Sequence, residues 1–444
     1  MIKREKAWLM LATLIVALLV GAAACNEDKK EAPPATEPGA SPTTGGTPQT
    51  TGEVLTIENI LQKDPTVTKR EEIVWGYMFE DSGALQGFGD PAGDGIEMAV
   101  QEINDAGGFQ VGDTIYTIRL AKRDTRSDVA NTVAVATELV LDENVKVIWG
   151  PASVGDPEST QITQQARILH LCPCPQRELT SLSSAEQVRD ESRWAFQTLP
   201  APSKFLPPGA RDTAREYPEF DTFATICANS ETGKTFCQFF EDAYTAAGFE
   251  HVGQELFPPE TADFSPFLTK LKGNDPDIIL NFVDAGPEQF LLLRQSWQLD
   301  LGEFYIGVEL PYDLFESLVG GPGIRDKIVS VGAAPRGHAQ YTSEKARVFF
   351  EEKYKGFTGG NLPPAAFAAL LTYDPAYMLV AAMQRAGTVD DTDKIAAALE
   401  EVHFNGFGED DMYFDERHIM VSGNDSCQVY QGQMDCVHHP PPTE

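Results

Sequence analysis

Residues 82–108 have the sequence SGALQGFGDPAGDGIEMAVQEINDAGG and shortly follow the apolar segment EIVWGYMF at residues 72–79. That apolar segment has the length and composition of a buried strand. After it, apolar residues at positions 96, 99, 100 and 103 recur at the spacing of one helix face, and Gly107 and Gly108 end the helix. A strand, a loop and an amphipathic helix in this order predict the first half of a βαβ unit.

The same alternation continues along the chain. Further strands are predicted at residues 116–124, 145–151, 168–173, 222–230, 277–284, 303–309 and 327–335. Helical spacing between most of them indicates right-handed crossovers and parallel sheets. The last third differs, and its helices are predicted at 342–356, 363–387 and 391–402, before a short β segment. Because the roughly 390 residues after position 52 are too many for one simple core, we predict an α/β fold of two doubly wound, Rossmann-like lobes with parallel central sheets.

The N-terminal region has a different composition. Three basic residues precede an apolar run that ends at position 24, and small residues lie directly before Cys25. This order is typical of a signal peptide, and the small residues resemble the lipobox of bacterial lipoproteins. We predict a lipoprotein signal peptide over residues 1–24 and a lipidated Cys25 with a disordered linker over residues 25–52, where no large apolar residue occurs. A plain secretory signal and an uncleaved anchor are the alternatives.

The charge balance excludes one class of partner. The chain has 34 Lys and Arg against 67 Asp and Glu, a formal net charge of -33. Nucleic-acid phosphates would repel such a chain, so we predict no nucleic-acid partner.

The cysteines predict disulfides. Seven occur, and setting Cys25 aside leaves six, an even number that favours disulfides in an exported chain. The candidate pairs are Cys427 with Cys436, across a hairpin-like segment, and Cys227 with Cys237, between a strand end and the next helix. Cys172 and Cys174 remain, and a bridge between them would be strained. A metal site is the alternative, with His438 and His439 after Cys436, but these lie in a tail, 437–444, that we expect to be frayed. We predict no metal.

Signatures of catalysis and of nucleotide binding are weak. The glycines at positions 87, 89 and 93 have one residue too many for a G-x-G-x-x-G fingerprint. His170 lies within a predicted strand, and we expect it to be packed there. We therefore predict no cofactor and no enzymatic activity. Asp284 and Glu309 each end a predicted strand, where a carboxylate could accept hydrogen bonds from a ligand ammonium. The alternative for each is a helix cap or a solvent-facing group.

Taken together, residues 71–436 resemble the type I periplasmic solute-binding proteins, specifically the branched-chain amino acid class of ABC transporters. The resemblance rests on the stretch at 82–108, on VIWGPASV, on DFSPFLTKLK and on YIGVELPYD, which keep the family's order and spacing. It implies two α/β lobes joined by three crossings, with a ligand held between them. Lobe 1 would comprise 71–198 plus 335–408, and lobe 2 would comprise 199–334 plus 409–436.

The resemblance also implies a ligand site. Glu309 matches the acid that receives a ligand ammonium. Ser153, with Val154 as the other alignment choice, matches the loop whose hydroxyl and N–H groups hold a ligand carboxylate. Phe88 matches an aromatic lid, and Thr232 and Asp284 fall near positions where the family has tyrosines.

One segment departs from the family pattern. CPCPQR places Cys174, Pro175 and Gln176 where small residues and a threonine are expected, so a carboxylate-binding hydroxyl is lost. Arg177 could replace it by binding a carboxylate bidentately, or Gln176 could bind an amide. The ligand class therefore stays open between an amino acid, an amide and a small organic acid.

These observations predict a monomeric, extracytoplasmic, lipid-anchored protein that captures a small polar solute and delivers it to ABC permease subunits. The alternative is a sensor that presents its closed form to a signalling receptor. A surface enzyme is a third possibility, which a turnover assay would reveal.

Overall fold

The computed structural model describes residues 54–175, 185–258, 261–283, 288–301, 304–306, 328–330, 342–363, 365–430 and 433–441. All of them belong to one compact unit, Thr51–Glu444. The first described helix is α2 (Ile57–Ile60), and Leu55 just before it forms a β-bridge with Phe404.

The first sheet has six strands in the order β2-β3-β1-β4-β5-β6. Their bounds are β1 Lys69–Phe79, β2 Phe109–Val111, β3 Thr114–Asp124, β4 Val147–Trp149, β5 Leu169–Cys172 and β6 Ala195–Gln197. Neighbouring strands are parallel except β2 and β3, which are antiparallel. The parallel βαβ arrangement predicted from the alternation of apolar segments is confirmed.

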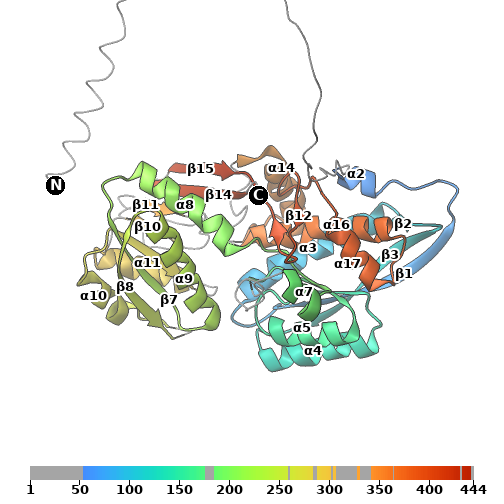
Figure 1. Cartoon of the computed structure of the whole chain (residues 1–444), viewed down its shortest axis with the longest axis horizontal. Coiled ribbons are helices and arrows are strands. Elements are labelled where there is room, and N and C mark those ends of the chain that lie inside the picture. The colour runs from blue at the N-terminus through green and yellow to red at the C-terminus, as the bar shows by residue number, and fades with distance from the viewer. Residues whose placement is uncertain are drawn as a thin grey trace, which may run out of the picture. The chain divides into compact units, whose positions relative to one another are not determined.

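Helices cover both faces of this sheet (Figure 1). On β1, Trp75 and Tyr77 point into the main core, whereas Val74 and Met78 contact a smaller cluster on the opposite face. The smaller cluster belongs to α4 (Val129–Asp142), with α5 (Asp156–Ala166) packed beside that helix. Strands with apolar residues on both faces are typical of sheets buried on two sides.

The main core also contains helices from distant parts of the chain. They are α3 (Gln86–Asp105), α14 (Glu344–Val348), the π-helical turn η3 (Phe349–Tyr354), the 3₁₀ turn η4 (Ala366–Ala369), α16 (Leu370–Ala386) and α17 (Thr392–Leu399). Short helices α7 (Ala185–Glu191) and α15 (Lys355–Phe357) complete this part. A Cβ on Gly95 would lie 2.1 Å from the carbonyl oxygen of Ala369, so α3 and η4 can approach this closely only because residue 95 is glycine. The segment Ala366–Ala386 is long and apolar enough to cross a membrane by length and composition, but its most apolar 18-residue window is buried in this core.

The second sheet has seven strands in the order β15-β14-β11-β10-β9-β7-β8. Their bounds are β7 Thr222–Ala228, β8 Glu250–Phe257, β9 Ile278–Phe282, β10 Phe304–Ile306, β11 Ile328–Ser330, β14 Asn424–Tyr430 and β15 Gln433–His439. Strands β7 to β11 pair in parallel, and the hairpin β14–β15 adds antiparallel strands at one edge. The predicted frayed tail therefore begins later than residue 437, because residues 437–439 pair with β14.

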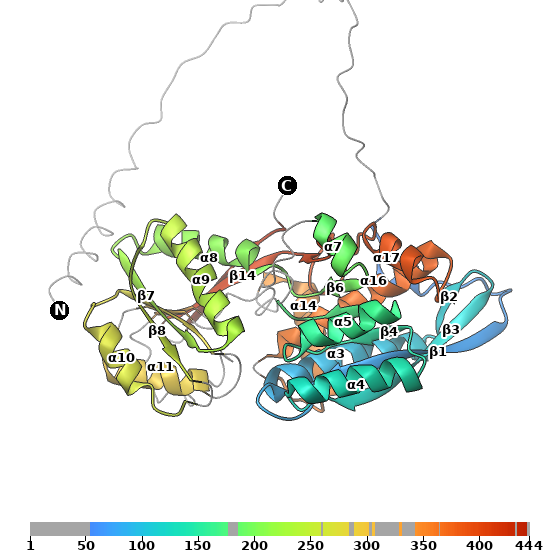
Figure 2. The ribbon, with the colours of Figure 1, turned by 60° about the horizontal axis from the view of Figure 1, so that its bottom comes forward.

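The helices of the second sheet also lie on both faces, with α8 (Pro202–Glu216) and α9 (Glu231–Ala246) on one and α10 (Ser265–Lys272) and α11 (Glu288–Gln298) on the other (Figure 2). Phe223 and Cys227 contact the first pair, and Ala224 and Ile226 contact the second. A small hairpin, β12 (Tyr413–Phe414) with β13 (Met420–Val421), precedes β14.

The chain passes between the two sheets three times. It leaves the first sheet after β6, returns between β11 and α14, and enters the second sheet again between β13 and β14. This is the three-crossing, two-sheet α/β fold predicted from the sequence. The residue limits of the two lobes stay predictions.

Both predicted cysteine pairs form disulfides. Cys427 and Cys436 face each other across the hairpin β14–β15, and Cys227 at the end of β7 is bonded to Cys237 in α9. Cys172 and Cys174, for which a bridge was expected to be strained, are also bonded to each other.

Candidate functional site

The carboxyl end of the first sheet holds a buried carboxylate. Glu80 directly follows β1, and its side chain is 0% exposed. Its Oε2 accepts a hydrogen bond from the N–H of Ala152 at 2.8 Å, and its Oε1 accepts from the N–H groups of Ser153 and Val154, each at 3.1 Å. Three consecutive backbone donors therefore converge on one side chain from a loop that lies more than seventy residues further along the chain.

Strand pairing positions these groups. Because β1 and β4 are parallel neighbours, with Tyr77 opposite Trp149, the residues that follow the two strands meet at the same edge of the sheet. Between β4 and the three donors, Gly150 has a φ of +88°, and a Cβ there would lie 2.4 Å from the carbonyl oxygen of Met78. Glycine is therefore required for this loop to turn back over the end of β1.

Burial raises the pKa of the Glu80 carboxyl group, and its hydrogen bonds with the three N–H groups oppose that rise without cancelling it. Hydrogen-bond donors of this kind are what makes a buried carboxyl group tolerable at all.

More acidic side chains lie near this edge. Asp81 accepts a hydrogen bond from the hydroxyl of Tyr77, and Asp124 accepts one from the Ser82 hydroxyl at 2.6 Å. Burial raises the pKa of Asp81, and the charges of Asp124 and Asp90 add to the rise. Lys122 forms an ion pair with Glu97 and lies 4.7 Å from the centre of the Tyr77 ring. The end of β1 therefore carries several carboxyl groups, and the charges of Lys122 and Arg126 act on them.

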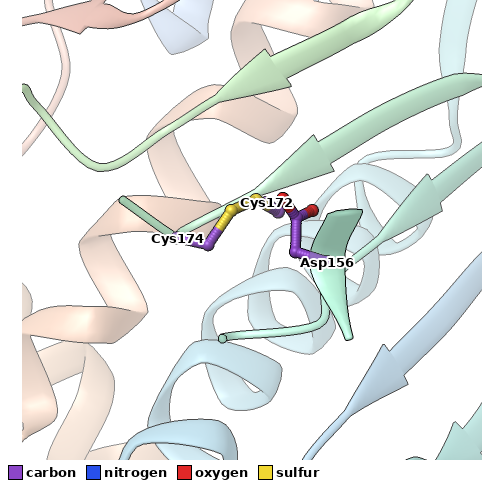
Figure 3. A group of neighbouring side chains, drawn as sticks. All are labelled: Asp156, Cys172 and Cys174. Atoms are coloured by element: carbon purple, nitrogen blue, oxygen red, sulfur yellow. A yellow bond between two sulfur atoms is a disulfide. The ribbon is translucent and has the colours of Figure 1, made fainter. Parts of the chain in front are cut away.

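A second buried polar cluster lies beside it, after β5 (Figure 3). Asp156, Cys172 and Cys174 place one potential ligand atom each within 4.8 Å of one another. The two sulfur atoms are bonded to each other, so neither is the thiolate that would bind a metal ion. His170 is 1% exposed, as expected for a packed histidine, and its Nε2 lies 2.5 Å from the carbonyl oxygen of Gly150. With its two cysteines in a disulfide, the cluster has one potential metal ligand, the Asp156 carboxylate.

The two histidines of the alternative metal site also have other partners. His438 lies with its Nδ1 3.1 Å from Asp425 and its Nε2 3.2 Å from Glu409. The Nε2 of His439 lies 2.7 Å from Asp212. Because Cys436 is in a disulfide and both histidines contact carboxylates, these residues do not combine with the cysteine into a metal site.

The structure brings only some of the predicted site residues together. Ser153 and Val154 lie at the end of β4, and Cys174 is buried beside Asp156. Phe88 lies in the first turn of α3, half-buried, with its ring centre 5.6 Å from that of Phe367. Thr232 lies in the first turn of α9, in the part of the chain that carries the second sheet. The remaining predicted residues lie outside the described residues: Gln176, Arg177, Asp284, Glu309 and the lipidation site Cys25. All these ligand roles stay predictions.

Glu80 is not among the site residues predicted from the sequence. The available signal was a carboxylate directly after a fully apolar strand, at the end of a parallel sheet where ligands bind. What the sequence does not show is its partner, because the loop that donates to it is distant along the chain.

Comparison with known proteins identifies the class. The sequence model of the periplasmic binding protein family matches residues 72–433, which is nearly all of the folded chain. The chain therefore belongs to this family, and its two parallel sheets with three connecting segments have the family's type I fold. Several proteins that the chain resembles are named as Leu/Ile/Val-binding proteins.

Three examples show the extent of the similarity. The Leu/Ile/Val-binding protein BraC3 of Rhizobium johnstonii is 22% identical over 336 residues, which cover 74% of this chain and 84% of that protein. The substrate-binding protein LivJ from Streptococcus pneumoniae, in complex with isoleucine, superposes with a TM-score of 0.66 and 22% identity over 84% of this chain and 100% of its own. A solute-binding protein from R. palustris, in complex with benzoate, has a TM-score of 0.67 and 16% identity over 84% of this chain and 98% of its own.

Proposed function

We propose that this protein is an extracytoplasmic lipoprotein that binds a small polar solute between its two lobes and delivers it to the permease of an ABC transporter. The observation that carries the proposal is the match of the family model to residues 72–433, together with two parallel sheets linked three times. The solute class is an amino acid, an amide or a small organic acid, since relatives are named for amino acids or are bound to benzoate.

The solute would contact the loops at the carboxyl ends of both sheets. On the first sheet these include Ser153 and Phe88, and on the second they include Thr232, Asp284 and Glu309. In this proposal Glu309 receives a ligand ammonium through charge-assisted hydrogen bonds. Binding favours the closed arrangement of the lobes only to the extent that the solute has a higher affinity for it.

Thermal melting tests the proposal directly. The full-length chain is melted with amino acids, their amides and small organic acids, and a solute that binds only the folded state stabilises it by about 2.7 kcal/mol at a hundredfold excess over Kd. We expect a concentration-dependent rise in melting temperature for at least one solute, which Glu309→Ala abolishes. A panel without any shift contradicts solute binding, and an unchanged affinity in Glu309→Ala contradicts the role of Glu309.

Anchoring and delivery need separate tests. Cys25→Ser should move the protein from the membrane fraction to the soluble fraction, because stable anchoring needs more than one acyl chain and the cysteine would carry them. Cells without the protein should lose uptake of the solute found by melting. Normal uptake in such cells would favour a sensor that presents its closed form to a signalling receptor.

A further inference from the structure

The backbone N–H groups that follow β4 already have a hydrogen-bond acceptor within the protein. The N–H groups of Ala152, Ser153 and Val154 all donate to the Glu80 carboxylate, at 2.8, 3.1 and 3.1 Å. We call residues 152–154 the β4 loop. Consecutive N–H groups pointing at one place form a binding site for an anion, and a carboxylate is a fitting occupant. Here the occupant is a side chain of the protein itself.

The surroundings disfavour a second anion. Asp81 follows Glu80 in the chain, and Asp124 ends β3, which pairs with β1 so that Asp124 lies opposite Phe79. Burial raises the pKa of Asp81, the Tyr77 hydrogen bond and the charge of Lys122 oppose that rise, and the charges of Asp124 and Asp90 add to it. Lys122, whose charge acts on Asp81, is paired with Glu97. A carboxylate brought to this edge would meet negative charge without free N–H donors from the β4 loop.

From this geometry we propose that Glu80 determines which solutes the site accepts. Its carboxylate fills the anion site of the β4 loop. The solute therefore presents a neutral or cationic group, an amide or an amine, to the first sheet. This inference rests on the proposed function. It replaces the expectation that the N–H groups of Ser153 or Val154 hold a ligand carboxylate. The isoleucine and benzoate bound to the two solved relatives both carry a carboxylate, so the solute of this protein would differ from both.

The first experiment asks whether the β4 loop is an anion site, independently of any solute. Glu80→Ala leaves three N–H groups without their acceptor and space for a small carboxylate. We expect acetate to raise the melting temperature of the full-length Glu80→Ala chain in a saturable manner and to leave the parent chain unchanged, with sodium chloride at the same ionic strength as the control. The absence of rescue by acetate overturns the assignment.

The second experiment measures specificity with matched probes: leucine against leucinamide, and benzoate against benzamide and benzylamine. In the parent chain we expect the amides or the amine to bind at least about tenfold more tightly than the carboxylates, and in Glu80→Ala we expect that ratio to fall at least about tenfold. Equal binding of both members of each pair in the parent chain overturns the inference and leaves the proposed function intact. This measurement needs no variant, so it decides the question even where Glu80→Ala does not fold.

Asp374 offers a matched control. Its carboxylate in α16 is also 0% exposed, and it accepts hydrogen bonds from the N–H groups of Phe407 at 3.1 Å and Gly408 at 2.7 Å. Asp374→Ala should lower the melting temperature as a structural change does and leave the preference between carboxylates and amides unchanged. An equal change of preference in both variants overturns a specific role of Glu80. The two experiments can also give different answers. If acetate stabilises Glu80→Ala but no probe binds the parent chain, Glu80 is supported as the occupant of an anion site and the proposed function is contradicted.

Discussion

The two sheets share an architecture but secure their loops by different chemistry. In the first sheet, the loop after β4 is held by the buried carboxylate of Glu80, and the disulfide Cys172–Cys174 spans only three residues at the end of β5. In the second sheet, the end of β7 is bonded to α9 through Cys227 and Cys237, and the edge hairpin is bonded through Cys427 and Cys436. Loops at the ends of parallel strands leave backbone groups that need partners, and either an ionisable side chain or a covalent bond can hold such a loop in place.

The apolar clusters packed against the two sheets can also be compared. Among the residues that the structure describes, each sheet has a separate apolar cluster on each face, and the largest of these clusters joins α3, α16 and strands of the first sheet. Smaller cores contribute less free energy, which is where disulfides add most. We therefore expect the β4 end of the first sheet to respond to the loss of a carboxylate, and strands β7, β14 and β15 of the second sheet to respond to the loss of their disulfides.

The largest effect should come from Glu80→Ala. Removal of the acceptor leaves three buried N–H groups unpaired, so we expect the free energy of unfolding to fall by about 3 kcal/mol, measured by urea denaturation. Glu158→Ala, on the exposed surface of α5, is the control and should change stability by less than about 0.5 kcal/mol. A loss in Glu80→Ala no greater than in the control would show that the carboxylate does not hold the loop.

The next effect should come from the disulfide of the second sheet. The pair Cys427→Ala and Cys436→Ala frees a loop closed over a sequence separation of 9 residues, and we expect a loss of about 2–3 kcal/mol. Hydrogen exchange should accelerate in β14 and β15 and stay unchanged in β1 and β3. Equal acceleration in both sheets would contradict the separation of the two lobes that the comparison draws.

Helix caps should show no difference between the lobes. Asp128 accepts a hydrogen bond from the N–H of Asn131 at 2.8 Å to begin α4, and Ser230 accepts one from the N–H of Gly233 at 2.9 Å to begin α9. Asp128→Ala and Ser230→Ala should each cost about 1 kcal/mol in thermal unfolding. Asp128→Asn and Ser230→Thr keep the capping oxygen and should restore most of the loss. A loss of stability in only one of the two alanine variants would contradict the expected equality of the two lobes.

The smallest effect concerns pH. Asp94 accepts a hydrogen bond from the Tyr354 hydroxyl at 2.8 Å, and burial raises its pKa, with Glu97 and Asp90 adding to the rise. A carboxyl group whose pKa is raised on folding stabilises the folded state below its ordinary pKa, and this contribution is lost as the pH rises through the raised value. Relative to Asp94→Asn, the parent chain should therefore lose stability from about pH 4 upward, by less than about 1 kcal/mol because Asp94 is only partly buried. Parallel pH profiles of the two chains in urea denaturation would refute this.

Some features could be predicted because their causes are local. The apolar segment at 72–79 and the helical spacing after it produce β1 and α3 as expected, and the same periodicity identifies β7 and β9. Cysteine parity and the short separations within each pair were enough to propose the two disulfides that the structure contains. The predicted helix 342–356 is helical but includes the π-helical turn η3, which side-chain periodicity does not distinguish from an α-helix.

The sequence by itself determined the α/β class, the two lobes and the family, because periodicity, strand length and motif order are properties of neighbouring residues. Only the tertiary structure decided that the N–H groups of Ser153 and Val154 serve Glu80, and that His439 in the tail pairs with Asn424 in β14. Both depend on which strands lie side by side. That choice is made by burying apolar faces across the whole chain, so a carboxylate and its donors can be distant in sequence and still meet at the edge of one sheet.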